Sequence, residues 1–136
     1  MNASPRALIE QSFPPIPAAA GAARVLVEAG TTSLPPDLVD TLVLLVSELI
    51  TNSVRHAQLG PNDDVGLSVE LLPRIIRVVV TDWGIGFEPT PPFAASQDPL
   101  EDAADGWGLR FVDRLADRWG TRSGPPTQVW FELSLP

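Results

Sequence analysis

The chain has 136 residues, about the length of one ordinary domain, and 44% of them are hydrophobic, which is the composition of a globular protein. Its formal net charge of -8 argues against nucleic acid or an anionic membrane as a direct partner, because both are bound mainly by clustered basic side chains. The absence of cysteine excludes disulfide bonds and thiolate metal sites.

The first part of the chain predicts a strand followed by two helices. It opens with MNASPRALIE, which has no basic segment followed by an apolar one, so we expect no secretory signal and a cytoplasmic location. Residues 7–13 predict a short strand, and the alanine-rich run 17–29, which ends before Gly30, predicts a helix. In residues 36–57 apolar side chains recur close to the i, i+3, i+4, i+7 spacing, which predicts a long amphipathic helix.

The second part predicts a hairpin, a lid, a helix and a last strand. Residues 65–72 and 74–82 are rich in β-branched side chains and predict two adjacent antiparallel strands. The next stretch is rich in Pro, Ala, Asp and Gly, and it exceeds the about 4 to 6 residues of an ordinary connection, so we expect a lid at 87–105. A helix is expected from 106 to about 118, and a strand over 127–136.

Together these elements predict one domain over residues 1–136. Its fold class is an α+β two-layer sandwich, in which about three helices cover one face of a mixed, mostly antiparallel sheet. In such a fold we expect the functional residues among the polar side chains and glycines on or beside its helices and strands.

The long predicted helix carries a carboxylate, an amide and a cation along one side. At about 100° per residue, Glu48, Asn52, Arg55 and His56 fall in one polar sector opposite the apolar stripe. All nine basic residues are arginine, so a phosphate ligand would depend on backbone amides, Arg55 and a metal ion. A solvated helix face gives the same pattern and stays open as an alternative.

The segment VVVTDWGIGF, residues 78–87, places a carboxylate and two glycines at the end of a predicted strand. Asp82 there can accept a hydrogen bond from an exocyclic amine, and Gly84 and Gly86 let the backbone approach a flat ring such as adenine. An ordinary turn that leaves a strand is the alternative interpretation.

In GWGLRFVDRL, residues 106–115, two glycines open a predicted helix. Free backbone amides at a helix start bind phosphate oxygens, assisted by the positive end of the helix dipole. A flexible connection into a surface helix would have the same composition.

In order and spacing, ExxxN on a helix, DxGxG after a hairpin and GxGL opening a helix resemble the nucleotide-binding fold of DNA gyrase, sensor histidine kinases and mismatch-repair ATPases. This is the GHKL or Bergerat fold. The short length, the form ELITNSVRHA, and the ending GWGLRFVDRLADRWG followed by TQVWFELSLP are similar to the anti-sigma-factor serine kinases and their small relatives. The resemblance covers about residues 7–136.

The resemblance implies ATP and Mg²⁺ as cofactors and assigns roles to individual residues. It implies that Asn52 ligates Mg²⁺, that Glu48 is the catalytic general base and that Asp82 reads the adenine amine. The other implied nucleotide-binding residues are Arg55, His56, Gly84, Gly86, Gly106, Trp107, Gly108, Leu109 and Thr127. His56 has a second interpretation as a hydrogen-bonded surface or core residue. Of the tryptophans, Trp83 and Trp107 are interpreted as walls or covers of the pocket, and Trp119 and Trp130 as core aromatics.

The function implied by the resemblance is that of an anti-sigma factor with serine/threonine protein kinase activity. Its partners would be an anti-sigma-factor antagonist of the STAS type, which it phosphorylates, and a sigma factor, and relatives of this kind commonly act as homodimers. One alternative is an ATP-binding module that regulates by docking without phosphoryl transfer, because the predicted lid contains acidic but no basic residues. A detached sensor-kinase domain that acts on histidine is less favoured, since no dimerisation helix with a histidine acceptor precedes the motifs.

Overall fold

The structure is a computed structural model that describes residues 4–56, 60, 62–83, 107–124 and 126–136. The helices and strands in this part of the chain are, in order, β1 (Arg6–Phe13), α1 (Ala18–Gly30), α2 (Pro36–His56), β2 (Val65–Leu71), β3 (Ile75–Asp82), α5 (Trp107–Leu115), β4 (Arg118–Arg122) and β5 (Thr127–Ser134). Among the described residues, none of the helices combines the length and the apolar character needed to cross a membrane.

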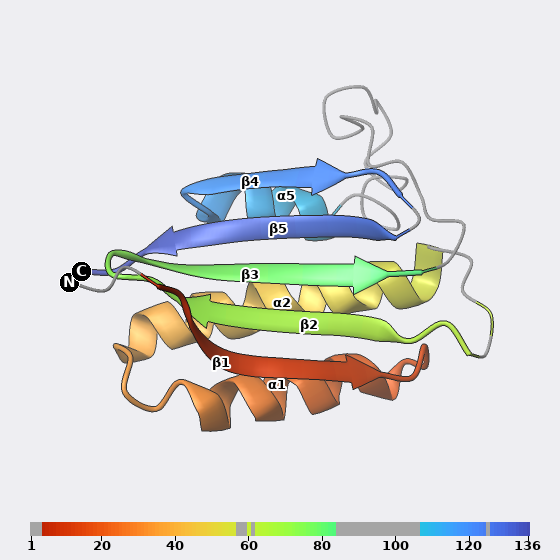
Figure 1. The fold of residues 1–136 in the computed structure, drawn as a ribbon, viewed down its shortest axis with the longest axis horizontal. Helices are drawn as coiled ribbons and strands as arrows, with labels where there is room; N and C mark the ends of the chain where they lie inside the picture. The colour runs from red at the N-terminus through yellow and green to blue at the C-terminus, as the bar shows by residue number, and fades with distance from the viewer. Residues whose placement is uncertain (1–3, 57–59, 61, 84–106, 125) are drawn as a thin grey trace.

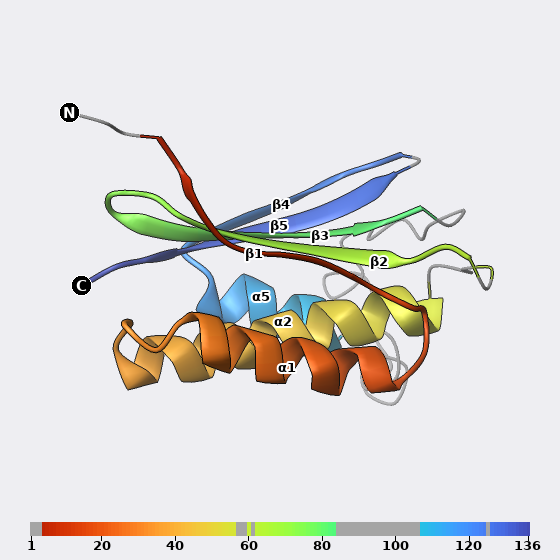
Figure 2. The ribbon, with the colours of Figure 1, turned by 60° about the horizontal axis from the view of Figure 1, so that its bottom comes forward.

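The strands form one sheet in the order β1-β2-β3-β5-β4, and each neighbouring pair is antiparallel. Figure 1 shows the sheet from its open side, and Figure 2 shows α1, α2 and α5 packed side by side against the other face. The fold is therefore the predicted α+β two-layer sandwich, with antiparallel pairing throughout the described sheet instead of a mixture of directions.

The two N-terminal helices form where they are predicted, α1 from its alanine-rich run and α2 from its apolar periodicity, and each agrees with its predicted bounds to within one residue. α1 contacts α2, and its buried side chains are small: Ala19, Ala20, Ala23 and Val27. Small side chains allow the two helices to pack closely. α2 buries a larger apolar stripe, made of Leu42, Leu45, Val46, Leu49 and Ile50.

Along the central strands, side chains alternate between the helix-covered face and the open face, as the period of two in a strand requires. The side chains that face the helices and fill the core are Val65, Leu67 and Val69 on β2, Ile76, Val78 and Val80 on β3, and Val129, Phe131 and Leu133 on β5. The residues between them face the open side, which no described helix covers.

Helix α5 is shorter than predicted, and the strand that follows it is not predicted at all. The helix ends at Leu115, where a helix to about residue 118 was expected, and β4 begins three residues later. The backbone N–H of Asp117 donates to the carbonyl of Glu132 at 3.0 Å, and the Asp117 carboxylate accepts from the N–H of Ser134 at 2.6 Å. The sequence RWGTR has no apolar run, so its strand conformation depends on pairing with β5.

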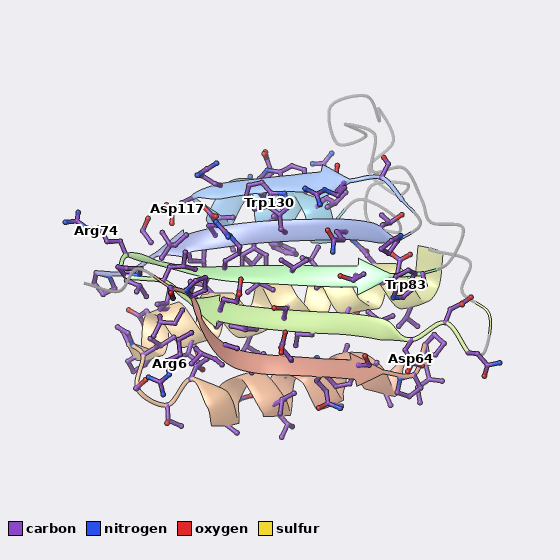
Figure 3. The ribbon with its side chains drawn as sticks, viewed as in Figure 1. Arg6, Asp64, Arg74, Trp83, Asp117 and Trp130 are labelled. Atoms are coloured by element: carbon purple, nitrogen blue, oxygen red, sulfur yellow. The ribbon has the colours of Figure 1, made fainter. Side chains whose placement is uncertain are left out.

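The two C-terminal tryptophans lie on opposite faces of the sheet. Trp119 packs partly buried against the core, as expected, and its indole N–H donates to Asp113 at 3.0 Å. Trp130 is not a core residue, which corrects the prediction: it follows buried Val129 on β5 and therefore points to the open face, where Figure 3 shows it.

Candidate functional site

Asp82, the last residue of β3, lies directly opposite Thr127, the first residue of β5, and both side chains are buried. On its other side Asp82 is paired with the buried Val65 of β2. Asp82 and Thr127 continue the alternation of the core residues Val80 and Val129, so they belong to the helix-covered face. A carboxylate and a hydroxyl are thereby brought together at one end of the sheet.

The C-terminal turns of α2 lie at the same end of the molecule as the end of β3, as both ribbon views show. α2 as a whole contacts β2 and β3, so it packs under the central strands. Here Asn52 is only 8% exposed, and its Nδ2 has no hydrogen-bond partner among the described residues. A buried amide N–H group without an acceptor is costly, which fits a group that acquires its acceptor from a ligand.

Two further predicted residues of α2 differ in exposure. Glu48 lies one helical turn before Asn52, on the same side of the helix, and is half-buried. Arg55 is exposed close to the C-terminus of the helix. A partly shielded carboxylate and a solvent-accessible guanidinium thus flank the buried amide.

The start of α5 points toward the same end of the molecule. The helix ends three residues before Arg118, which pairs with Glu132 at the far end of β5, away from Thr127. The other end of α5, beginning at Trp107, is therefore directed toward the end of the sheet that carries Asp82. Leu109 is 2% exposed and anchors the first turn of this helix in the core. Backbone amides of such a turn are available to an anion.

Of the predicted site residues, the structure thus brings Asn52, Asp82, Thr127 and the start of α5 to one end of the fold. Gly84, Gly86, Gly106 and the expected lid at 87–105 lie outside the described residues. His56 is the last residue of α2, and Trp107 and Gly108 open α5; their side chains are not described. Trp83, expected at the pocket, is 59% exposed beside the end of β3.

One contact near this site was missed by the sequence analysis. The Gln128 amide donates a hydrogen bond of 3.3 Å to the Thr81 hydroxyl, one residue from the Asp82–Thr127 pair and on the open face. It adds a side-chain link between the ends of β3 and β5, where the backbone ladder pairs Asp82 with Thr127. The segment TQVWF does show two polar residues before its alternating part. Their partners on β3 follow only from the register between β3 and β5, which the sequence does not reveal.

The described residues include side chains that suit ATP with a magnesium ion. They contain no group of three or more His, Asp or Glu that could bind a metal. Mg²⁺ commonly takes few protein ligands and completes its shell with phosphates and water. The amide of Asn52 is a suitable single ligand through its oxygen, and the buried carboxylate of Asp82 is a suitable acceptor for an amine.

Comparison with known proteins identifies the family to which the chain belongs. Residues 13–133 match the model of the family described as the histidine kinase-like ATPase domain. None of the curated proteins with which the sequence was compared is significantly similar to it. The match spans nearly the whole chain and runs from the last residue of β1 to the penultimate residue of β5, so the chain belongs to the histidine kinase-like ATPase domain family, within the GHKL superfamily.

Proposed function

We propose that this ATP-binding domain is a protein serine kinase of the anti-sigma type, which phosphorylates an anti-sigma-factor antagonist of the STAS type and holds a sigma factor in the alternative state. Family membership supports binding of ATP in a regulatory setting. The observation that carries the proposal is that Glu48 and Asn52 lie in the C-terminal part of α2, whose end is at the same end of the fold as the buried Asp82–Thr127 pair.

In this proposal Asp82 and Thr127 select the base. Both are buried, so a hydrogen bond from the adenine amine to the Asp82 carboxylate would form away from competing water. The Thr127 hydroxyl, on the adjacent strand, can bond to the same edge of the ring. Guanine has a carbonyl where adenine has its amine, so GTP should bind more weakly.

Glu48 and Asn52 would serve the phosphate end of the nucleotide. A serine hydroxyl is a weak nucleophile at neutral pH, and Glu48 is half-buried, so part of its side chain is accessible to solvent. It would accept the hydroxyl proton as the serine oxygen attacks the γ-phosphorus of ATP and ADP leaves with the bridging oxygen. Mg²⁺ bound with ATP would neutralise charge on the phosphates, and Asn52 would orient the metal. The exposed Arg55 would contact phosphate.

Nucleotide binding is tested by thermal unfolding. With ATP or ADP and Mg²⁺ at 100 times the dissociation constant, the free energy of unfolding should rise by about 2.7 kcal/mol. For a domain of this size that gain raises the Tm by several degrees, and GTP should raise it less. An unchanged Tm at millimolar nucleotide would contradict the assignment of the site.

Phosphoryl transfer is tested separately, with ATP labelled at the γ-phosphate and STAS-type antagonist domains encoded by the same genome. Label on a serine supports the kinase proposal. A second candidate function, regulation by ATP-dependent docking without transfer, is favoured by the lack of basic residues in 87–105. Nucleotide-dependent binding of an antagonist that never becomes labelled would decide for this second candidate.

A further inference from the structure

A hollow on the open face of the sheet gathers three of the chain's nine arginines. It has a volume of about 390 Å³, and we call it the basic hollow. The residues of its lining that matter here are Arg77, Val79, Arg118, Arg122, Trp130 and Glu132. They come from β3, β4 and β5, whose open-face side chains no described helix covers.

The charges in the basic hollow do not cancel. Glu132 is 3% exposed and accepts two hydrogen bonds from Arg77, at 2.8 and 2.6 Å. Arg118 lies 3.5 Å from the other Glu132 oxygen, and its side chain is 72% exposed. Arg122 is exposed at the opposite end of β4. The lining has three arginines and one glutamate, and Glu70, which pairs with Arg77 from β2, lies beside it, so one positive charge remains uncompensated on a chain whose formal net charge is -8.

An aromatic side chain lies between these arginines in a fixed position. Trp130 packs over Gly120 of β4: a Cβ added to Gly120 would meet the indole ring at 2.9 Å, so only glycine permits this packing. The guanidinium of Arg118 lies 5.9 Å from the centre of the ring. The indole is thereby held against the sheet and contributes a partly exposed apolar surface to the hollow.

We propose that the basic hollow is a docking surface for an acidic segment of a partner protein. The excess arginine charge binds side-chain carboxylates, for which a guanidinium has two suitably placed N–H groups. Trp130 packs against the aliphatic part of the same segment. Arginine and tryptophan are also the residue types that dominate the energetics of protein interfaces.

Two other occupants fit the hollow less well. A nucleic acid carries phosphates along its whole length and is held by long basic tracts, whereas this hollow is short and is lined by three arginines. A symmetric dimer centred on the hollow would place arginines against arginines, because a two-fold interface brings the same patch of each copy together.

The docking surface is distinct from the nucleotide site. Thr81 and Gln128 face the open side, whereas their neighbours Asp82 and Thr127 face the helices. The two sites therefore lie on opposite faces of the sheet, and the acidic segment should bind with or without nucleotide. This inference goes beyond the proposed kinase activity and does not depend on it.

The test measures binding of a fluorescent hexaglutamate peptide by anisotropy at low ionic strength. The hollow variant carries Arg118→Gln and Arg122→Gln, which leaves the Arg77–Glu132 pair in place. Its matched control carries Arg24→Gln and Arg114→Gln, which remove two exposed arginines from α1 and α5. Circular dichroism of each variant checks that the fold is retained.

The hollow variant should bind hexaglutamate about threefold to tenfold more weakly than the unmodified chain, and the control variant about equally well. Added salt should weaken binding to the unmodified chain. Equal loss in both variants would overturn the proposal. So would tighter binding of an oligothymidylate of the same charge, or a dimer in sedimentation that the hollow variant alone converts to monomer.

Discussion

Asp82 and Thr127 are direct neighbours across the ladder between β3 and β5, and although both are polar they are only 3% and 5% exposed. Polar side chains are buried at such a cost only where hydrogen bonds compensate for lost water. Their position at the end of the sheet, beside the last turns of α2, makes this pair the most informative feature of the candidate site.

Asp82→Asn should weaken nucleotide binding while preserving the shape of the side chain. The amide no longer offers a charged acceptor to the adenine amine, so the affinity for ATP should fall by about 1.5 to 3 kcal/mol, or roughly tenfold to more than a hundredfold. Calorimetric titration measures the change. Asp64→Asn, an exposed substitution just before β2, is the matched control and should leave the affinity unchanged.

Glu48→Gln should separate binding from transfer. The amide keeps the size of the side chain but cannot accept the serine proton, so transfer of labelled phosphate should fall by about a hundredfold or more while the Kd for ATP stays near that of the unmodified chain. The assay needs an antagonist that the unmodified chain phosphorylates. Transfer at the original rate by the variant would rule out Glu48 as the general base.

Asn52→Ala should affect the magnesium dependence of binding more than the stability of the fold. Because Nδ2 makes no hydrogen bond with a described residue, its loss should change the free energy of unfolding without nucleotide by less than about 1 kcal/mol. Titrating ATP with and without Mg²⁺ should show that the metal no longer strengthens binding. A large drop in Tm without nucleotide would instead assign Asn52 a structural role.

Arg77→Gln should destabilise the fold more than Arg118→Gln, although both arginines lie beside the buried Glu132. Arg77 is 37% exposed and makes two short hydrogen bonds to this carboxylate, so its loss leaves Glu132 poorly compensated and should cost about 1 to 3 kcal/mol. Arg118 is more exposed and more distant, so its loss should cost less than about 1 kcal/mol. Urea unfolding of the two variants provides the comparison, and equal costs would contradict it.

The parts of the fold that sequence predicts well are those whose signal is local. α2 and the β2–β3 hairpin repeat their apolar residues at the helical or strand period, and both appear where expected. β4 has no such signal, because it is a short edge strand whose conformation depends on β5. Trp130 was misplaced because residue type alone does not tell which face of a strand an aromatic side chain occupies.

In the candidate site, too, some features follow from the local sequence and others only from the pairing of distant strands. The polar side of α2 follows from helical geometry, so the grouping of Glu48 and Asn52 needs no tertiary information. The pairing of Asp82 with Thr127 joins residues far apart in the chain and was not predicted; the resemblance to GHKL proteins implied only that both residues bind the nucleotide. Gln128 and Thr81 were missed because their contact exists only in the observed register.

The hairpin between β2 and β3 limits where the length of this chain can change during evolution. Its turn is closed by a hydrogen bond of 2.9 Å from Leu72 to Ile75, and the strands remain in register from there to the pair of Val65 and Asp82. One residue inserted into β3 before Asp82 would shift every later side chain of that strand to the other face, since the strand period is two. Insertions after Trp83 leave this register unchanged. Lineages that keep the site should therefore differ in length after β3 and scarcely at all within it.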